Sequence, residues 1–216
     1  MEEDEEESSV KVVLIGETGV GKTCIISRYI NNIFEDNVKT NCASFSSKTL
    51  TFPEFKNKAI KFEIWDTAGQ EKYRALNKVF YKEAAICILV YDITNEDSFN
   101  ALKDYYCKQI RDICSKDIIV GIAGNKCDLL ENEVISEEEG RNFAKEMNAV
   151  FERTSASQNI GIEDLFHNLG CKYIDANFKD INETEPKDDK ENQKGKIYKL
   201  NGKKIKEEDD KKKKCC

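Results

Sequence analysis

Short apolar runs alternate with longer amphipathic stretches from Val10 to about Ala176. This alternation is typical of parallel strands joined by helical crossovers, so it predicts an α/β fold. The strands are expected at Val10–Ile15, Ser44–Phe52, Lys58–Trp65, Ala85–Tyr91, Ile118–Ala123 and Ala149–Arg153. The helices are expected at Lys22–Asn31, Glu96–Cys114, Glu137–Met147 and Ile162–Tyr173, the third with a capping box formed by Ser136 and Glu139.

The predicted strands differ in hydrophobic pattern, and the difference orders them in a sheet. The first, fourth and fifth are almost continuously apolar, as strands covered on both faces should be, so they belong at the sheet centre. The third alternates between apolar and polar residues, and with the second it flanks a turn at Pro53–Asn57. These two should form an antiparallel pair at one edge. The expected sheet therefore has six strands, is mostly parallel, carries one antiparallel edge strand and is flanked by helices.

Charge is unevenly distributed along the 216 residues, whose formal net charge is −7. Residues 1–9 are acidic, residues 10–176 form one expected domain, and residues 177–216 are rich in Lys, Asp, Glu and Asn. Both end segments have too little hydrophobicity to offset the entropy of ordering, so we expect them to be disordered. No apolar run reaches the roughly 18 to 20 residues that cross a bilayer, and the acidic start lacks the features of a signal peptide, so a cytosolic chain is expected.

The nine cysteines include no CxxC pair. An odd number without such spacing favours reduced thiols over a disulfide framework, and it gives no support to a structural zinc site. His167 is the only histidine, and it is interpreted as having no ligand-spaced partner. It is therefore expected to be an ordinary residue on a helix surface.

The segment GETGVGKT, residues 16–23, fits the pattern GxxxxGK(S/T) between the first strand and the first helix. Glycines let such a loop direct backbone N–H groups at phosphate oxygens, while Lys22 supplies positive charge and the Thr23 hydroxyl can ligate Mg²⁺. A purely structural turn would not need Lys and Thr at the helix start. The loop alone does not choose between ATP and GTP. The expected nucleotide contacts are Gly16, Thr18, Gly19, Val20, Gly21, Lys22, Thr23 and Cys24.

A second polar motif, Asn125-Lys126-Cys127-Asp128, follows the buried strand that ends near Ala123. It therefore lies at a strand carboxyl end, where open α/β sheets bind ligands. The Asp128 carboxylate can accept hydrogen bonds from N1–H and the exocyclic amine of guanine, whereas adenine presents a lone pair at the matching ring position. The motif predicts a guanine site made by Asn125, Lys126, Asp128 and Leu129.

A third motif, Asp66-Thr67-Ala68-Gly69-Gln70-Glu71, follows the alternating strand. Asp66 emerges at a strand end, where a carboxylate can hold Mg²⁺, usually through water. Gly69 can bring a backbone N–H close to a γ-phosphate. Gln70 can orient a water for in-line attack, because an amide offers both a donor and an acceptor. An ordinary loop would explain Asp66 and Gly69 but not their coincidence with two other nucleotide motifs.

In the order GETGVGKT, WDTAGQE, NKCD and Thr154-Ser155-Ala156, these motifs resemble the Ras superfamily of small GTPases. WDTAGQEKYRAL, the stretch Tyr91–Asn95 and the final Cys-Cys resemble its Rab branch, which regulates vesicle traffic. The resemblance implies a three-layer P-loop GTPase domain that binds GTP or GDP with Mg²⁺ and slowly hydrolyses GTP. It also implies an activating protein, an exchange factor, effectors, and prenylation escort and dissociation-inhibitor proteins as partners, with no nucleic acid.

The resemblance carries further residue roles. Ser155, Ala156 and Ser157 are implied to support the guanine, and Phe34 to flank it. Lys22 and Gln70 are the implied catalytic residues. The implied aromatic surface read by effectors comprises Phe45, Trp65 and Phe80, although an ordinary core position is nearly as good an interpretation of Phe80.

The chain departs from the family pattern at several positions. The segment 37–45 is one residue short, so the Mg²⁺-binding threonine is Thr40 when counted back from Phe45, whereas counting forward places Asn41 there. Thr40 is favoured because a hydroxyl can ligate Mg²⁺ and loops absorb deletions at their tips. Ser157 stands where lysine is common. Thr18 places a branched side chain near the γ-phosphate, which predicts slower intrinsic hydrolysis.

The last six residues, KKKKCC, combine a basic cluster with two thiols, Cys215 and Cys216. The resemblance implies geranylgeranyl groups on both cysteines, and hence attachment to the cytoplasmic face of intracellular vesicles with a cytosolic pool. Two lipid chains anchor firmly where one is marginal, and lysines add attraction to anionic lipid. A solvated lysine-rich tail is the alternative.

Two other functions fit parts of the sequence. A guanine-nucleotide-binding module that no longer cycles is suggested by the irregular segment 37–45. A P-loop ATP kinase would share the phosphate loop, but Asp128 argues against adenine.

Overall fold

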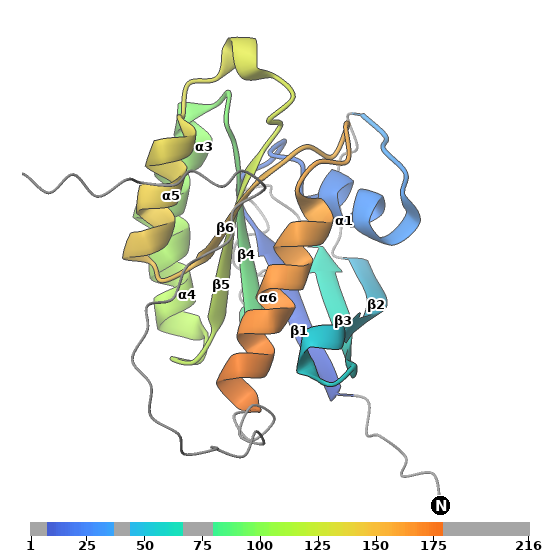
Figure 1. The fold of residues 1–216 in the computed structure, drawn as a ribbon. Coiled ribbons are helices and arrows are strands. Elements are labelled where there is room, and N and C mark those ends of the chain that lie inside the picture. Colours follow the sequence, from blue (N-terminus) through green and yellow to red (C-terminus); the bar gives the residue numbers. More distant parts are fainter. Residues whose placement is uncertain (1–7, 37–43, 67–79, 179–216) are drawn as a thin grey trace, which may run out of the picture. The chain divides into compact units, whose positions relative to one another are not determined.

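The computed structural model describes residues 8–36, 44–66 and 80–178. The chain divides into two units, Met1–Glu183 and Thr184–Cys216, and the described residues all belong to the first. Figure 1 labels their strands and α-helices. In chain order the elements are β1 (Ser8–Ile15), α1 (Lys22–Asn31), β2 (Ser44–Phe52), η1 (Pro53–Phe55), β3 (Lys58–Asp66), β4 (Ile86–Asp92), α3 (Glu96–Ala101), η3 (Leu102–Tyr106), α4 (Cys107–Ile113), β5 (Ile119–Asn125), η4 (Leu130–Asn132), α5 (Glu137–Glu146), β6 (Val150–Thr154) and α6 (Ile162–Asn177). None of the described helices combines the length and apolar character needed to span a bilayer.

The six strands form one sheet in the order β2-β3-β1-β4-β5-β6. All neighbouring pairs are parallel except β2 and β3, whose register runs from Ser44 opposite Asp66 to Phe52 opposite Lys58. The predicted antiparallel edge pair is therefore confirmed. The three strands predicted as almost continuously apolar, β1, β4 and β5, are interior strands of the sheet, and every residue of β4 and β5 is buried.

Helices cover both faces of the sheet, which gives three layers (Figure 1). The two sides of β1 show how: Val12 and Leu14 pack in the cluster formed with α1 and α6, while Val13 and Ile15 pack in the cluster formed with α3, η3, α4 and α5. Side chains of successive strand residues point to opposite faces, so a continuous apolar run is what a doubly covered strand requires.

The segment predicted as a single helix from Glu96 to Cys114 differs in its interior. It begins as an α-helix at Glu96, with the Asn95 side chain accepting a hydrogen bond from the Ser98 N–H, then forms a π-helical turn over Leu102–Tyr106 and returns to α-helix. A π turn inserts one residue into the helical repeat, and apolar periodicity over a few turns does not reveal it. The predicted ends are right within one residue.

The other helices follow their local signals. The predicted capping box is confirmed: the Ser136 hydroxyl accepts from the Glu139 N–H, and the Glu139 carboxylate accepts from the Ser136 N–H. Helix α6 runs four residues beyond the predicted Tyr173, to Asn177. Its buried residues continue to Ile174, so packing against the sheet extends the helix past the point where its sequence pattern fades.

Gly170 allows α6 to approach the end of β2. A Cβ atom at this position would lie 2.1 Å from Cζ of Phe52, whose side chain is fully buried. A Gly170→Ala substitution should gain about 1 kcal/mol of helix propensity but lose about 1–3 kcal/mol to overpacking. We expect a net loss of stability of up to about 2 kcal/mol, measured as a lower urea midpoint.

The double variant Gly170→Ala with Phe52→Leu tests the cause of that loss. A Cβ atom at position 170 would collide with the ring of Phe52. If this collision causes the loss, the double variant should lose less stability than the sum of the two single losses. A midpoint that Gly170→Ala raises would show that α6 moves away at little cost, because only the gain in helix propensity would then remain.

Candidate nucleotide site

The three sequence motifs meet at the carboxyl edge of the parallel strands. The phosphate loop follows β1, Asp66 ends β3, and the Asn125 motif begins at the last residue of β5. Asn125 joins two of these segments: its Nδ2 donates to the Val20 carbonyl at 2.8 Å, and its Oδ1 accepts from the Thr154 hydroxyl at 3.1 Å. The phosphate loop, the predicted base loop and β6 are thus held together by one buried amide.

Two glycines make the phosphate loop compact. A Cβ atom on Gly16 would lie 2.2 Å from the carbonyl oxygen of Val90, and one on Gly21 would lie 2.3 Å from Nδ2 of Asn125. Gly21 also has a left-handed backbone, with φ of 96°, immediately before α1. The loop therefore packs against the ends of β4 and β5 as only glycine permits.

Lys22, the first residue of α1, points its amine into the loop. The side chain is buried, and Nζ donates to the carbonyl oxygens of Gly16 and Glu17, each at 2.9 Å. Burial lowers the pKa of Lys22 to about 8, partly offset by the charges of Asp66 and Glu17. An anionic phosphate at the loop would favour the charged amine, because a nearby opposite charge stabilises the ionised form.

Asp66 and Thr23, two of the predicted Mg²⁺ ligands, contact each other. The Thr23 hydroxyl donates to Oδ2 of Asp66 at 2.6 Å, while Oδ1 of the same carboxylate is buried and has no hydrogen-bond partner within the described ranges. Burial raises the pKa of Asp66, with the Thr23 hydrogen bond and Lys22 acting in the opposite direction. A buried carboxylate oxygen without a partner is costly, and Mg²⁺ prefers such oxygen ligands. These residues therefore fit the ion that the sequence implied.

The predicted base-recognition residue is held in its ionised form. Asp128 is exposed, and its Oδ1 accepts from the Ser155 hydroxyl at 2.5 Å. Partial desolvation raises the pKa of Asp128, but hydrogen bonds from Ser155 and Ser157 outweigh it, and the net pKa is lowered. Ser157, in the position where the family commonly has lysine, thus contributes a hydroxyl to this network.

Arg28 is a site residue that sequence reasoning missed. From α1 its Nε donates to the Ala156 carbonyl at 2.8 Å, and its Nη2 donates to the Ser157 carbonyl at 3.2 Å. These bonds tie the helix that follows the phosphate loop to the loop predicted to support the base. The partners lie 128 and 129 residues apart in the chain, so no local pattern signals the contact.

The remaining predicted residues divide into three groups. Along the same edge lie Val20, which is buried, Thr18 and Gly19, which are exposed, and Phe34 and Leu129, which are 37% and 41% exposed. Two side chains turn to other partners: Lys126 pairs with Asp92 at 2.6 Å, and Cys24 donates to the Glu35 carbonyl at 3.5 Å. Outside the described residues lie Thr40, Gly69, Gln70, Cys215 and Cys216.

Of the three aromatic residues predicted to form an effector surface, Trp65 contacts both of the others. The ring of Trp65 lies 5.2 Å from that of Phe45 and 5.6 Å from that of Phe80, measured between centroids. Phe45 is 52% exposed, whereas Phe80 packs against the buried cluster on the α3 side. The cluster exists, and its role in binding remains a prediction.

The interpretation of His167 as having no ligand-spaced partner is wrong. Cys171 lies four residues further along α6, which places the two on the same helical face. Glu54 of η1 joins them, and its carboxylate lies 2.9 Å from Nε2 of His167. The spacing H-x-x-x-C was visible in the sequence, but a search for paired cysteines passes over it.

Comparisons with known proteins agree with this geometry. A sequence model of the Ras family matches residues 11–175. Human Ras-related protein Rab-22A is 43% identical over 158 residues, which cover 73% of this chain and 79% of that protein. Human Ras-related protein Rab-21 is 44% identical over 165 residues, which cover 76% and 71%. Mouse Ras-related protein Rab-31 is 39% identical over 161 residues, which cover 74% and 80%. The chain therefore belongs to the Ras family, in its Rab branch, and is a small GTPase that binds GTP or GDP with Mg²⁺.

Proposed function

We propose that this chain is a membrane-anchored switch in intracellular vesicle traffic, with the phosphates on the loop 16–23 and the guanine on Asp128. The observation that carries the proposal is the pair of hydrogen bonds made by Asn125. They join the phosphate loop, at Val20, to the end of β6, at Thr154, next to the residues predicted to bind the guanine. The similarity to three Rab proteins supports the cellular role.

Different residues of the chain have different proposed roles in GTP hydrolysis. The Lys22 amine and the backbone N–H groups of its loop neutralise phosphate charge, which is the main requirement of phosphoryl transfer. Thr23, Asp66 and Thr40 are the proposed metal ligands, and the ion supplies further charge neutralisation on the phosphates when bound. Gln70 is proposed to position the attacking water. Loops near Thr40 and Gly69 would hold one arrangement with GTP and another with GDP.

The described arginines support a need for an activating protein. Arg28 binds the Ala156 and Ser157 carbonyls, Arg111 donates to the Cys107 carbonyl, Arg141 pairs with Glu137, and Arg153 pairs with Glu133. Each arginine within the three described ranges is thus engaged away from the phosphate loop. An activating protein would supply the missing positive charge in trans, so intrinsic turnover should be slow.

Membrane attachment is proposed through the C-terminal segment. Cys215 and Cys216 would carry geranylgeranyl groups, with the lysines of residues 211–214 adding attraction to anionic lipid. The proposed location is the cytoplasmic face of intracellular vesicles, with a cytosolic pool held by escort and dissociation-inhibitor proteins. Effectors, an exchange factor and an activating protein complete the proposed set of partners.

One preparation tests the central proposal. Nucleotide extracted from the purified chain should be GDP or GTP, and added GTP should be hydrolysed slowly. Hydrogen exchange near residues 37–45 and 67–79 should differ between the GDP form and the form with a non-hydrolysable GTP analogue. Binding without hydrolysis and without that difference would favour the non-cycling module, and equal competition by ATP would favour the kinase.

A further inference from the structure

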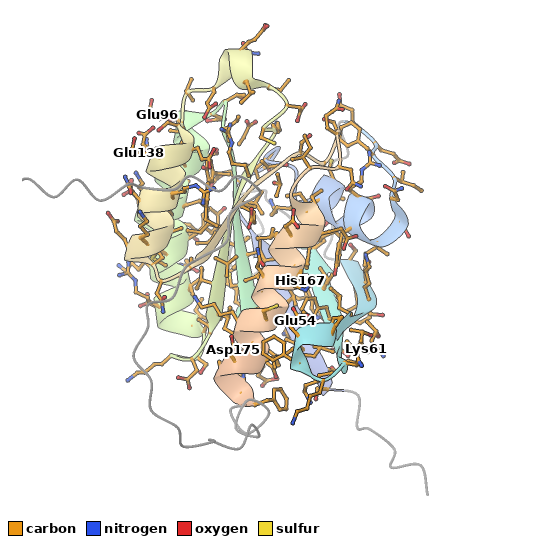
Figure 2. The ribbon with its side chains drawn as sticks, in the orientation of Figure 1. Glu54, Lys61, Glu96, Glu138, His167 and Asp175 are labelled. Carbon is orange, nitrogen blue, oxygen red and sulfur yellow. The ribbon has the colours of Figure 1, made fainter. Side chains whose placement is uncertain are left out.

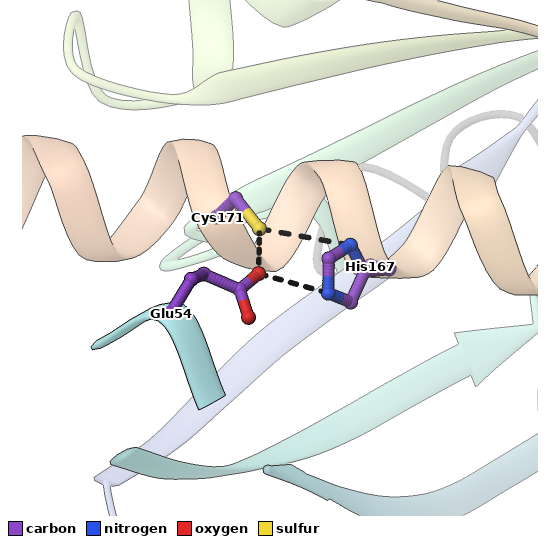
Figure 3. Close-up of side chains that lie close together, drawn as sticks. All are labelled: Glu54, His167 and Cys171. Carbon is purple, nitrogen blue, oxygen red and sulfur yellow. Dashed lines mark hydrogen bonds and ion pairs between the residues drawn. The ribbon is translucent and has the colours of Figure 1, made fainter. Parts of the chain in front are cut away.

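Three metal-ligating side chains converge at the end of the domain opposite the nucleotide loops. Phe52, the last residue of β2, pairs with Lys58, whereas the metal carboxylate Asp66 lies at the other end of β3. Directly after Phe52, η1 carries Glu54, which faces His167 of α6 (Figure 2). Cys171 completes the group (Figure 3). One carboxylate, one imidazole and one thiol thus come from two elements.

Their ligand atoms are close together. Oε1 of Glu54 lies 2.9 Å from Nε2 of His167 and 3.1 Å from Sγ of Cys171, and Nδ1 of His167 lies 3.7 Å from the same sulfur. Ligand atoms on a tetrahedral zinc ion, with bonds of about 2.0–2.3 Å, lie roughly 3.3–3.8 Å apart. The carboxylate would therefore need only slight separation from its two neighbours to share a small ion with them, once a single imidazole nitrogen faces that ion.

The backbone on both sides of the group is fixed by the core. His167 and Cys171 lie one helical turn apart on α6, whose inward face, including Phe166 and Leu169, is fully buried. On the other side, Phe52 is fully buried beneath Gly170 and also packs its ring 5.4 Å from the imidazole of His167. The ligands are thus carried on rigid elements, which reduces the entropy lost on metal binding.

We propose that Glu54, His167 and Cys171 bind one Zn²⁺ ion, with water as the fourth ligand. A sulfur, a nitrogen and an oxygen donor suit zinc, whereas Mg²⁺ and Ca²⁺ take oxygen ligands alone. Binding replaces the thiol proton of Cys171, which leaves to solvent, so one thiolate and one carboxylate balance the charge of the ion. Such an ion joins the end of β2 to α6.

The imidazole must turn for this to happen. At present its two nitrogens face different partners, Nε2 the carboxylate and Nδ1 the sulfur, and one ion takes a single ring nitrogen. The side chain of His167 is 46% exposed and that of Glu54 is 41% exposed, so both have room to change rotamer. Exposure on this side also gives the ion and its water a route in from solvent.

Cobalt(II) spectroscopy and zinc titration test the site. The probe protein is the full-length, unprenylated chain with Cys215→Ser and Cys216→Ser, loaded with GDP and Mg²⁺ so that the terminal thiols and the nucleotide metal site do not contribute. We expect one tightly bound Zn²⁺ and, with Co²⁺, a thiolate-to-metal charge-transfer band in the near ultraviolet. Cys171→Ser should abolish the band, whereas Cys114→Ser, a half-buried cysteine elsewhere, should keep it.

Glu54→Gln and His167→Gln keep the test decisive if Cys171→Ser folds poorly. Both replace exposed side chains, and each should weaken Zn²⁺ binding by roughly tenfold or more. Thermal stabilisation by added Zn²⁺ should shrink in parallel. GDP affinity should be unchanged in both, which separates this site from the nucleotide site. Absence of the band, or equal Zn²⁺ affinity in all variants, would overturn the proposal and leave a hydrogen-bonded surface group.

Discussion

Replacing Asp128 by Asn should lower the affinity for GDP and GTP by on the order of 10²–10⁴-fold, because two hydrogen bonds to a charged carboxylate are each worth roughly 1.5–3 kcal/mol. Asn keeps one acceptor oxygen and places an NH₂ donor where guanine presents its exocyclic amine. A purine with a carbonyl at that position should fit the variant. Titration with fluorescent GDP and xanthosine diphosphate (XDP) measures both effects, and XDP should bind the variant more tightly than GDP.

The hydrogen bonds around Asp128 should survive its replacement by Asn. Oδ1 of Asp128 accepts from the Ser155 hydroxyl, and an amide oxygen accepts in the same way, so the loop should keep its shape. Thermal stability without added nucleotide should therefore change little. If Asp128→Asn changes neither the affinity for GDP nor that for XDP, this residue does not recognise the purine, and the proposed orientation of the nucleotide is wrong.

The parts of this protein that sequence predicts are those fixed by local pattern. The run of apolar residues in β4 requires cover on both faces, and the alternation in β3 marks the edge pair. Ser136 and Glu139 meet because capping geometry acts over three residues. The phosphate loop is predictable for the same reason, since its motif is one continuous segment between a strand and a helix, and Lys22 bonds within it to the carbonyls of Gly16 and Glu17.

What sequence did not predict depends on contacts between distant segments. Arg28 binds the Ala156 and Ser157 carbonyls only because the fold brings α1 next to the loop after β6. Glu54 and Cys171 are 117 residues apart and meet because Gly170 lets α6 pack on Phe52. The π turn at Leu102–Tyr106 likewise coincides with a long-range bond, from the Tyr106 hydroxyl to the Glu17 carboxylate at 3.1 Å.

The substitution Lys22→Met should produce the second large effect. Met keeps the apolar stem but removes the amine, so the affinity for GTP should fall by roughly 30- to 1000-fold, equivalent to about 2–4 kcal/mol of charge-assisted hydrogen bonding. GTP hydrolysis should fall further, on the order of 10²–10³-fold, because charge on the phosphates grows in the transition state. Single-turnover hydrolysis at saturating GTP separates the two losses.

Stability and pH dependence distinguish this explanation from misfolding. The pKa of Lys22 is lowered to about 8 by burial, so the buried charge destabilises the fold, whereas the hydrogen bonds of the amine to the Gly16 and Glu17 carbonyls stabilise it. Met removes both effects, so the melting temperature without nucleotide should change little. Wild-type affinity for GTP should weaken as pH rises above the pKa of about 8, since the neutral amine must then take up a proton when phosphate binds. Lys22→Met should lack this additional loss. A variant that keeps the wild-type pH profile would show that the amine does not act on the phosphates, and one that melts much earlier would show that misfolding causes the lost affinity.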